Sequence, residues 1–329
     1  MADVTDRFDR GQLILITGLV VALLLVVLVV LLNAVIYTEN IGTREVDGDS
    51  REPIGFQNEV IEVTGSMIDA ENEAEHDDEE FDEVRDQVLD GVVRSNELLS
   101  QQYAETGVVA EINTTDDALE DAAIEGHMIR QNESRTFESP VPGDPESWRV
   151  AEDINDSSIR QYEMTVDGGL TGADPSDPAA DGAFYIEIDD GTDNWRLYAF
   201  QDNGDPTLAV ANGSEPVDDP TILNCGDGEL PVELDLTAGE VDGDACSKLT
   251  WANELDEEYD VYYRNADNAE GTFNTTIKGE DSPIDHPSPN QAEQPYEVPA
   301  VYGMELNVSF YTADITYEAT VRVAPGEPA

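Results

Sequence analysis

Side chains suited to acid–base catalysis are either scarce in this sequence or too common to single out. Only three histidines occur, His76, His127 and His286, and each lies in a different segment. Histidine titrates near neutral pH, so this scatter gives little support to a histidine-centred mechanism. Carboxylate pairs, as used for glycoside hydrolysis, occur throughout the chain, and no one pair stands out. Since G-x-S-x-G, P-loop, dinucleotide-binding and H-E-x-x-H motifs are also absent, we expect neither an enzyme nor a cofactor.

Two acidic segments offer oxygen ligands of the kind that calcium prefers. They are Asp-Asp-Gly-Thr-Asp-Asn at 189–194 and Asp-Asn-Gly-Asp at 202–205. Neither has the spacing of an EF-hand loop. We therefore interpret both as acidic hairpin turns and predict no metal site.

The two cysteines, Cys225 and Cys246, lie 21 positions apart with no histidine near them. A zinc site needs four ligands, which this pair does not supply. A disulfide is the simplest interpretation outside the cell, and two free buried thiols are the alternative.

Sites for N-glycosylation are frequent in the chain. The N-x-S/T triplet, without proline in the middle, occurs six times: at Asn113, Asn132, Asn155, Asn212, Asn274 and Asn307. Because such sites are used on secreted surfaces, their number favours an extracellular location.

The charge of the chain is extreme. Its 329 residues include 74 acidic and 15 basic side chains, a formal net charge of −59, and only two of the bases are lysines. At molar salt the screening length falls to about 3 Å, and the self-repulsion becomes tolerable. We interpret the composition as adaptation to a salt-saturated habitat. Intrinsic disorder and an acidic tail are weaker interpretations, because the charge is spread through strand-like segments. Nucleic acid is excluded as a partner, since phosphate requires a basic surface.

One uncharged apolar run, residues 13–36, is long enough to cross a bilayer of about 30 Å as a helix. A cleaved secretory signal is the rival, but its apolar region is only about 7–15 residues long. Flanking basic residues are balanced, so the orientation rests on the glycosylation triplets and the cysteine pair. We expect a single-pass membrane protein with the bulk of the chain outside the cell.

The period of the apolar residues changes along the rest of the chain. Between 56 and 103 they recur every three or four positions, as on an amphipathic helix. Beyond 106 they alternate, as in Tyr162, Met164 and Val166, which predicts strands joined by hairpins. The expected fold is α+β: a transmembrane helix, an amphipathic helical stalk, then an antiparallel β-rich, sandwich-like extracellular domain. The expected segments are a cytoplasmic head or leader (1–12), the membrane helix (13–36), a polar linker and stalk (37–105) and the acidic β-rich domain (106–329).

The start of the apolar run carries a resemblance. The sequence RGQLILITG, beginning at Arg10, resembles the signal and hydrophobic stem of archaeal type IV pilin-like proteins. The layout of the chain is also similar to uncharacterised membrane-anchored surface proteins of halophilic archaea. The resemblance implies processing beside Gly11, which would leave Gln12 near the new N-terminus. Many pilins carry a glutamate about five residues into the mature stem, and Ile16 stands there instead, so a minor or non-assembling relative is the better form of the idea.

These observations lead to one functional expectation and one alternative. We expect a non-enzymatic, pilin-like envelope protein that makes structural or assembly contacts with the membrane, with pilin-like subunits or with other envelope proteins. The alternative is a tethered extracellular domain that binds a small solute or a cation.

Overall fold

The computed structural model describes residues 52–74, 80–119, 121–140, 145–154, 158–192, 194–211, 220–249, 258–279 and 295–327. The chain divides into two compact units, residues 1–58 and 59–329, and all described strands lie within the second.

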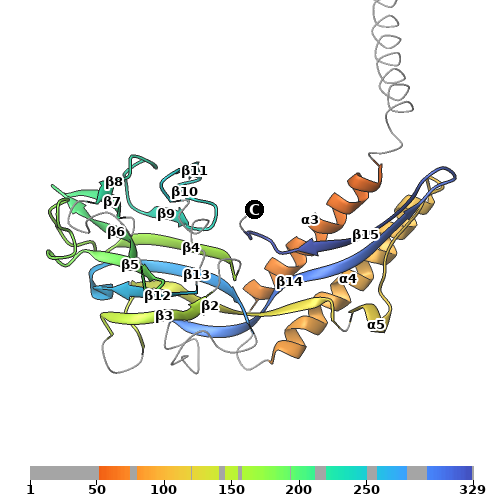
Figure 1. Ribbon diagram of the computed structural model, residues 1–329, viewed down its shortest axis with the longest axis horizontal. Coiled ribbons are helices and arrows are strands. Elements are labelled where there is room, and N and C mark those ends of the chain that lie inside the picture. The colour runs from red at the N-terminus through yellow and green to blue at the C-terminus, as the bar shows by residue number, and fades with distance from the viewer. Residues whose placement is uncertain are drawn as a thin grey trace, which may run out of the picture. The chain divides into compact units, whose positions relative to one another are not determined.

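Two antiparallel sheets make up most of the second unit (Figure 1). The nine-stranded sheet has the order β1-β14-β2-β13-β4-β9-β10-β11, with β15 also paired to β14. Its strands are β1 (Val109–Ile112), β2 (Ala123–Thr136), β4 (Ile159–Gly168), β9 (Val232–Asp235), β10 (Glu240–Val241), β11 (Asp244–Ala245), β13 (Glu270–Lys278), β14 (Tyr296–Tyr311) and β15 (Thr316–Val323). The six-stranded sheet has the order β3-β12-β5-β6-β7-β8. Its strands are β3 (Ser147–Ile154), β5 (Phe184–Asp189), β6 (Asn194–Asp202), β7 (Asp205–Ala211), β8 (Thr221–Ile222) and β12 (Tyr259–Arg264).

The two sheets share one hydrophobic core. Alternate residues of each strand point into it, among them Met164 and Phe273 from the larger sheet and Ile186 and Leu197 from the smaller. Such alternation is what places one face of each sheet against the other. Aromatic rings gather at the centre, where Phe137 stacks on Phe184 with ring centroids 5.0 Å apart. The face of the larger sheet that points away from this core is polar, and the candidate site lies there.

Helix α3 (Glu52–Glu73) and helix α4 (Phe81–Ala104) are the two long helices of the described residues; a four-residue helix, α5 (Asp116–Leu119), and a 3₁₀ turn, η2 (Ala266–Asn268), are short. On α4, Val84, Val88, Val92 and Leu99 form one buried stripe. A repeat of this kind buries a single face and leaves the remainder to water. Helix α4 contacts β1 and β14, and Figure 1 shows it running along the C-terminal half of β14.

These observations correct the expected fold class. The described chain is mostly antiparallel β structure, sandwich-like, and α4 and the C-terminal half of α3 lie against the larger sheet instead of forming a stalk before it. None of its helices combines the length and the apolarity needed to cross a membrane. This finding contradicts the expectation of a single-pass transmembrane protein with most of its chain outside the cell. The predicted span itself, residues 13–36, lies outside the described residues, as do the leader and the processing residues Arg10, Gly11 and Gln12.

Polar side chains hold the C-terminal half of α3 against the larger sheet. Asn72 is fully buried, and its amide both donates to Val301 O (2.9 Å) and accepts from Val301 N (2.9 Å). Arg130 donates to the carbonyl oxygens of Asn72, Glu73 and Ala74, which end the helix. A cation on these carbonyls satisfies groups that have no partner within the helix and complements its dipole.

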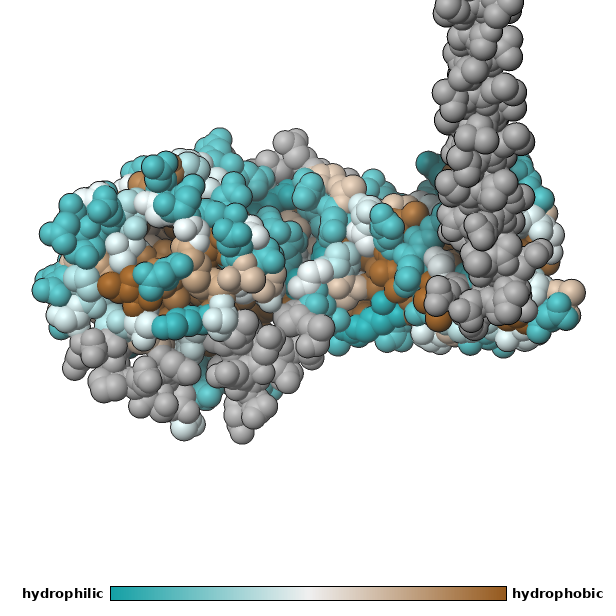
Figure 2. Space-filling model, turned by 90° about the horizontal axis from the view of Figure 1, so that it is seen from above, coloured by the Kyte–Doolittle hydropathy of each residue, from teal (hydrophilic) through white to brown (hydrophobic). Residues whose placement is uncertain are grey.

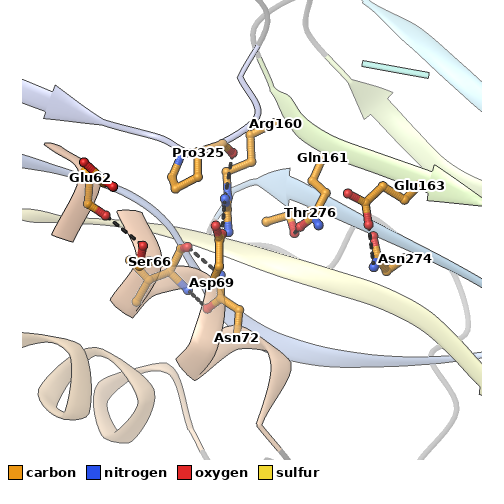
Figure 3. A network of polar contacts seen from close by, with 11 residues as sticks. Glu62, Ser66, Asp69, Asn72, Arg160, Gln161, Glu163, Asn274, Thr276 and Pro325 are labelled. Carbon is orange, nitrogen blue, oxygen red and sulfur yellow. Dashed lines mark hydrogen bonds and ion pairs between the residues drawn. The ribbon is translucent and has the colours of Figure 1, made fainter. Parts of the chain in front are cut away.

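A second arginine, Arg160 on β4, joins the helix to the end of the chain (Figure 3). Its Nη1 donates to Asp69 Oδ1 (2.9 Å) and to Pro325 O (2.7 Å), and the side chain is fully buried. The helix, β4 and the residues that follow β15 are therefore fixed to one another by a single guanidinium group.

The surface of the unit reflects its composition. Figure 2 shows one face, on which hydrophilic side chains predominate and apolar ones appear between them. An excess of 59 negative charges over the whole sequence must be accommodated mainly on surfaces of this kind.

Candidate functional site

A groove of about 620 Å³ lies on the larger sheet. Its lining residues come from β2, β13, β4, β9, β10 and the turn after β10: Gln131, Asn132, Glu163, Met164, Thr165, Glu233, Leu234, Asp235, Glu240, Gly243, Thr272, Phe273 and Asn274. Four of these carry carboxylates and none is lysine or arginine. The groove therefore concentrates negative charge without a basic residue in its lining.

Strand register brings three of the carboxylates into one row. Glu163 on β4 stands opposite Asp235 on β9, and Asp235 stands opposite Glu240 on β10. Residues directly opposite in antiparallel strands share a face, with Cβ atoms about 4.5–5.5 Å apart. Like charges in such positions destabilise a sheet. The row is thus an arrangement that costs folding free energy when nothing binds it.

A polar amide closes the row on its other side. Asn274 on β13 stands opposite Glu163, and its Nδ2 donates to Glu163 Oε2 (3.3 Å), as Figure 3 shows. The next cross-strand pair, Thr276 and Gln161, is also hydrogen bonded (3.4 Å). Glu163 therefore has one partner, an amide, and no cation among the described residues.

Asp235 and the neighbouring Asp242 shape the rim of the groove. Asp235 Oδ1 accepts from the backbone N–H groups of Thr237 and Ala238, and so holds the turn between β9 and β10. Asp242 Oδ1 accepts from the backbone N–H of Glu233 (2.9 Å). Within the described residues, the hydrogen bonds to the turn use Oδ1 of Asp235.

Two buried acceptor atoms of the lining lack partners within the described structure. They are Oε1 of Gln131 and Oδ1 of Asn274. Gln131 is fully buried, and its Nε2 donates to Gly271 O (2.8 Å) and Arg135 O (3.1 Å). Buried acceptors without partners are rare in folded proteins, because such atoms usually accept a hydrogen bond from the protein or from water. Gln131 stands opposite the core residue Phe273, so its side chain lies on the core face, whereas Asn274 stands opposite Glu163 on the face of the carboxylate row.

The chemistry of this lining is the binding of donors. Ionised carboxylates and amide oxygens accept hydrogen bonds, and ammonium groups donate up to three each. Within the described residues, no three His, Cys, Asp or Glu side chains are arranged to hold a metal ion. An organic cation, whose charge is spread along a chain, fits a row of single carboxylates better than a compact metal ion does.

The acidic segments considered as calcium sites stabilise the turns in which they lie. Asp189 Oδ1 accepts from Gly191 N (2.8 Å) and Asp190 Oδ1 from Thr192 N (2.7 Å) in the turn between β5 and β6. Asn203 and Gly204 adopt positive φ values in the turn between β6 and β7. Both segments therefore form hairpin turns, as the sequence predicted; Asp193 lies outside the described residues.

The predicted disulfide is confirmed. Cys225, which follows β8, bonds to Cys246 at the end of β11, with Cα atoms 5.8 Å apart. The bond ties the edge of the smaller sheet to the β9–β11 end of the larger one, next to the groove. Free thiols, the alternative, are thereby excluded for these two residues.

The glycosylation triplets fall into three groups. Asn113 and Asn307 are exposed and lie on neighbouring chain segments, since Asn113 N donates to Asn307 O. Asn132 and Asn274 line the groove. Asn155 and Asn212 lie outside the described residues. Use of any of the six stays a prediction.

Sequence reasoning missed the groove because its carboxylates are distant in sequence. The period-two pattern around Glu163 does show which side chains point away from the core. It does not show that β4 pairs with β9, since about 70 residues and several strands separate them. A weak signal was present in Val-Glu-Leu-Asp at 232–235, which alternates apolar and acidic residues like β4.

Comparison with known proteins gives a partial match to a family of unknown function. A family of unknown function (DUF7261) matches residues 7–142. This span covers α3, α4, β1 and β2, but of the groove it includes only the two β2 residues. No curated protein and no solved structure matches the chain.

Proposed function

We propose that the protein is a non-enzymatic binding module whose groove on the larger sheet takes a small organic cation, such as a linear oligoamine. The observation that carries the proposal is the row Glu163, Asp235 and Glu240, three carboxylates in cross-strand register with no base in the lining. Adjacent strands are about 4.8 Å apart, so the row repeats at a spacing that successive ammonium groups of an extended amine can follow.

Two further features support the proposal. Asn274, whose Oδ1 lacks a partner within the described structure, lies beside Glu163 in the same lining. Binding a cation would also relieve the repulsion within the row, so that ligand binding regains part of the free energy that the unoccupied row costs.

Calorimetric titration with spermidine in about 1 M KCl tests the proposal, because at this salt concentration long-range attraction to the net charge is screened. We expect the double variant Glu163→Gln/Asp235→Asn to bind about tenfold more weakly than the wild type, through loss of charge-assisted hydrogen bonds. Glutamine and asparagine keep the acceptor oxygens that Asn274 and the β9–β10 turn use.

The matched control is Glu97→Gln/Glu111→Gln, which removes the same charge at exposed positions outside the groove. It should bind spermidine like the wild type. Equal loss of affinity in both double variants would show that the amine responds to net charge alone and would overturn the proposal.

A second candidate function, structural or assembly contacts between copies, is favoured by a different observation. Within the part of the chain that the structure describes, no element covers the β15 edge of the larger sheet.

A further inference from the structure

The larger sheet has two edges beside β14. The C-terminal half of β14 pairs with β1 on one side and with β15 on the other. A strand at an edge presents a row of N–H and C=O groups that can pair with another chain, and proteins usually cover or interrupt such a row.

Helix α4 covers the β1 edge. Asn96 Oδ1 accepts from Ile112 N (2.7 Å), and Ser100 Oγ donates to Ala110 O (2.9 Å). On β1, Ala110 and Ile112 are the residues whose backbone groups point away from β14, because their neighbours form the hydrogen bonds to β14. Side chains of α4 therefore satisfy the edge that a strand would otherwise use.

The β15 edge has no such cover within the described part of the chain. The bond from Asn113 N to Asn307 O shows that Asn307 directs its backbone toward β1, so that its neighbours Leu306 and Val308 direct theirs toward β15. Their partners on β15 are Val321 and Ala319. The alternate residues Thr316, Glu318, Thr320 and Arg322 consequently turn their backbone groups outward, and all four are exposed.

We propose that this edge pairs with β15 of a second copy of the chain, antiparallel and about a two-fold axis at Thr320. In that register Thr320 faces its counterpart as a hydrogen-bonded pair. Glu318 of each copy then stands opposite Arg322 of the other, because both lie two residues from the axis. The backbone N–H and C=O groups of all three residues point outward, so they can form the hydrogen bonds between the two β15 strands.

Charge selects this register over its neighbours. A two-fold axis at Glu318 would place the two copies of Glu318 directly opposite each other. An axis at Arg322 would do the same to the two copies of Arg322. Opposite charges in cross-strand positions stabilise a pair of strands, and like charges destabilise it. Arg322 is already held on the strand surface by Glu327 (Nη2–Oε1, 2.6 Å), and Glu318 accepts from the Tyr311 hydroxyl group, so neither side chain must be newly ordered.

The net charge sets the conditions. Two copies that each carry −59 repel one another strongly, and this repulsion is screened only over distances beyond the Debye length. We therefore expect pairing in molar KCl and loss of pairing in dilute buffer.

Cysteine cross-linking of the full chain tests the register. Paired Cα atoms at a hydrogen-bonded position are about 5.5 Å apart, within disulfide reach. Oxidation of the Thr320→Cys variant with diamide in about 2 M KCl should give a covalent dimer on a non-reducing gel. The control Thr316→Cys places the new thiols about 27 Å apart in the same register and should stay monomeric. A Thr320→Cys variant that cross-links no better than Thr316→Cys would overturn the proposal.

Charge reversal provides an independent test. Added to Thr320→Cys, Glu318→Arg turns both cross-strand pairs into repulsive ones and should slow dimer formation roughly tenfold. Glu111→Arg makes the same change of charge on β1, whose edge α4 covers, and should not slow it. An equal or greater yield with Glu318→Arg would contradict the register even if the chain associates by another surface.

Discussion

At the scale of single residues, Asn72 determines how α3 meets the sheet. Its amide makes both hydrogen bonds that the backbone of Val301 offers, and it is fully buried. Asn72→Ala would leave a buried N–H and a buried C=O without partners, and each such group costs about 1–3 kcal/mol. We expect the free energy of unfolding to fall by about 3 kcal/mol, measured by urea denaturation with circular dichroism.

The control for this prediction lies on the same helix. Ser66 is exposed and donates only to Glu62 O within the helix (2.9 Å), so Ser66→Ala should change the free energy of unfolding by less than about 0.5 kcal/mol. A loss of similar size in both variants would mean that helix propensity, and not the contact with Val301, determines the effect.

At the scale of elements, β13 and β4 approach so closely that one residue must lack a side chain. A Cβ atom at Gly271 would lie 1.9 Å from the backbone oxygen of Thr165 and 2.9 Å from the ring of Phe137. Gly271→Ala therefore requires the strands to separate, and we expect a loss of at least about 3 kcal/mol or failure to fold. Gly168→Ala, in the same sheet with open space around the added methyl group, should leave the urea midpoint nearly unchanged.

The contribution of Glu327, which follows β15, to the stability of the fold depends on pH. Burial acts to raise the pKa of Glu327, but hydrogen bonds from Arg322 and Tyr302 outweigh it, so the pKa lies below its ordinary value of 4.5. A lowered pKa means that the carboxylate stabilises the fold above about pH 4.5, and that this contribution is lost as the pH falls through the lower, folded value. Glu327→Gln should therefore lower the urea midpoint at pH 7 and approach the wild type as the pH falls below 4.5. A constant difference between the two proteins across this range would contradict the prediction.

How far the sequence predicts these elements depends on the range of the interactions involved. Alternation at Tyr162, Met164 and Val166 identifies the core face of β4, because burial acts on each strand locally. The turns at 189–192 and 202–205 are likewise set by neighbouring residues. The packing of the helices on the sheet, the close approach at Gly271 and the carboxylate row all arise from pairings between distant segments, which no local pattern records.

At the scale of the whole molecule, the charge balance must decide the conditions under which the fold is stable. A net charge of −59 opposes compaction, and two arginines of the described residues are already engaged, Arg130 by helix carbonyls and Arg160 by Asp69 and Pro325. Screening by salt is then the main remaining relief. We expect the urea midpoint to rise steeply between about 0.1 M and 2 M KCl and then to level off, as the Debye length falls from about 10 Å to below 3 Å.

Sucrose separates screening from general stabilisation by excluded solutes. At equal osmotic strength it should raise the midpoint far less than KCl does, because it leaves the repulsion between carboxylates unscreened. The variant Glu163→Gln/Asp235→Asn, which dissolves the like-charged row, should be more stable than the wild type at low salt, and the difference should shrink at high salt. If KCl and sucrose acted equally, or if the double variant gained nothing at low salt, repulsion within the sheet would not limit stability. Relief of repulsion between the carboxylates of the row would then not favour the binding of a cation.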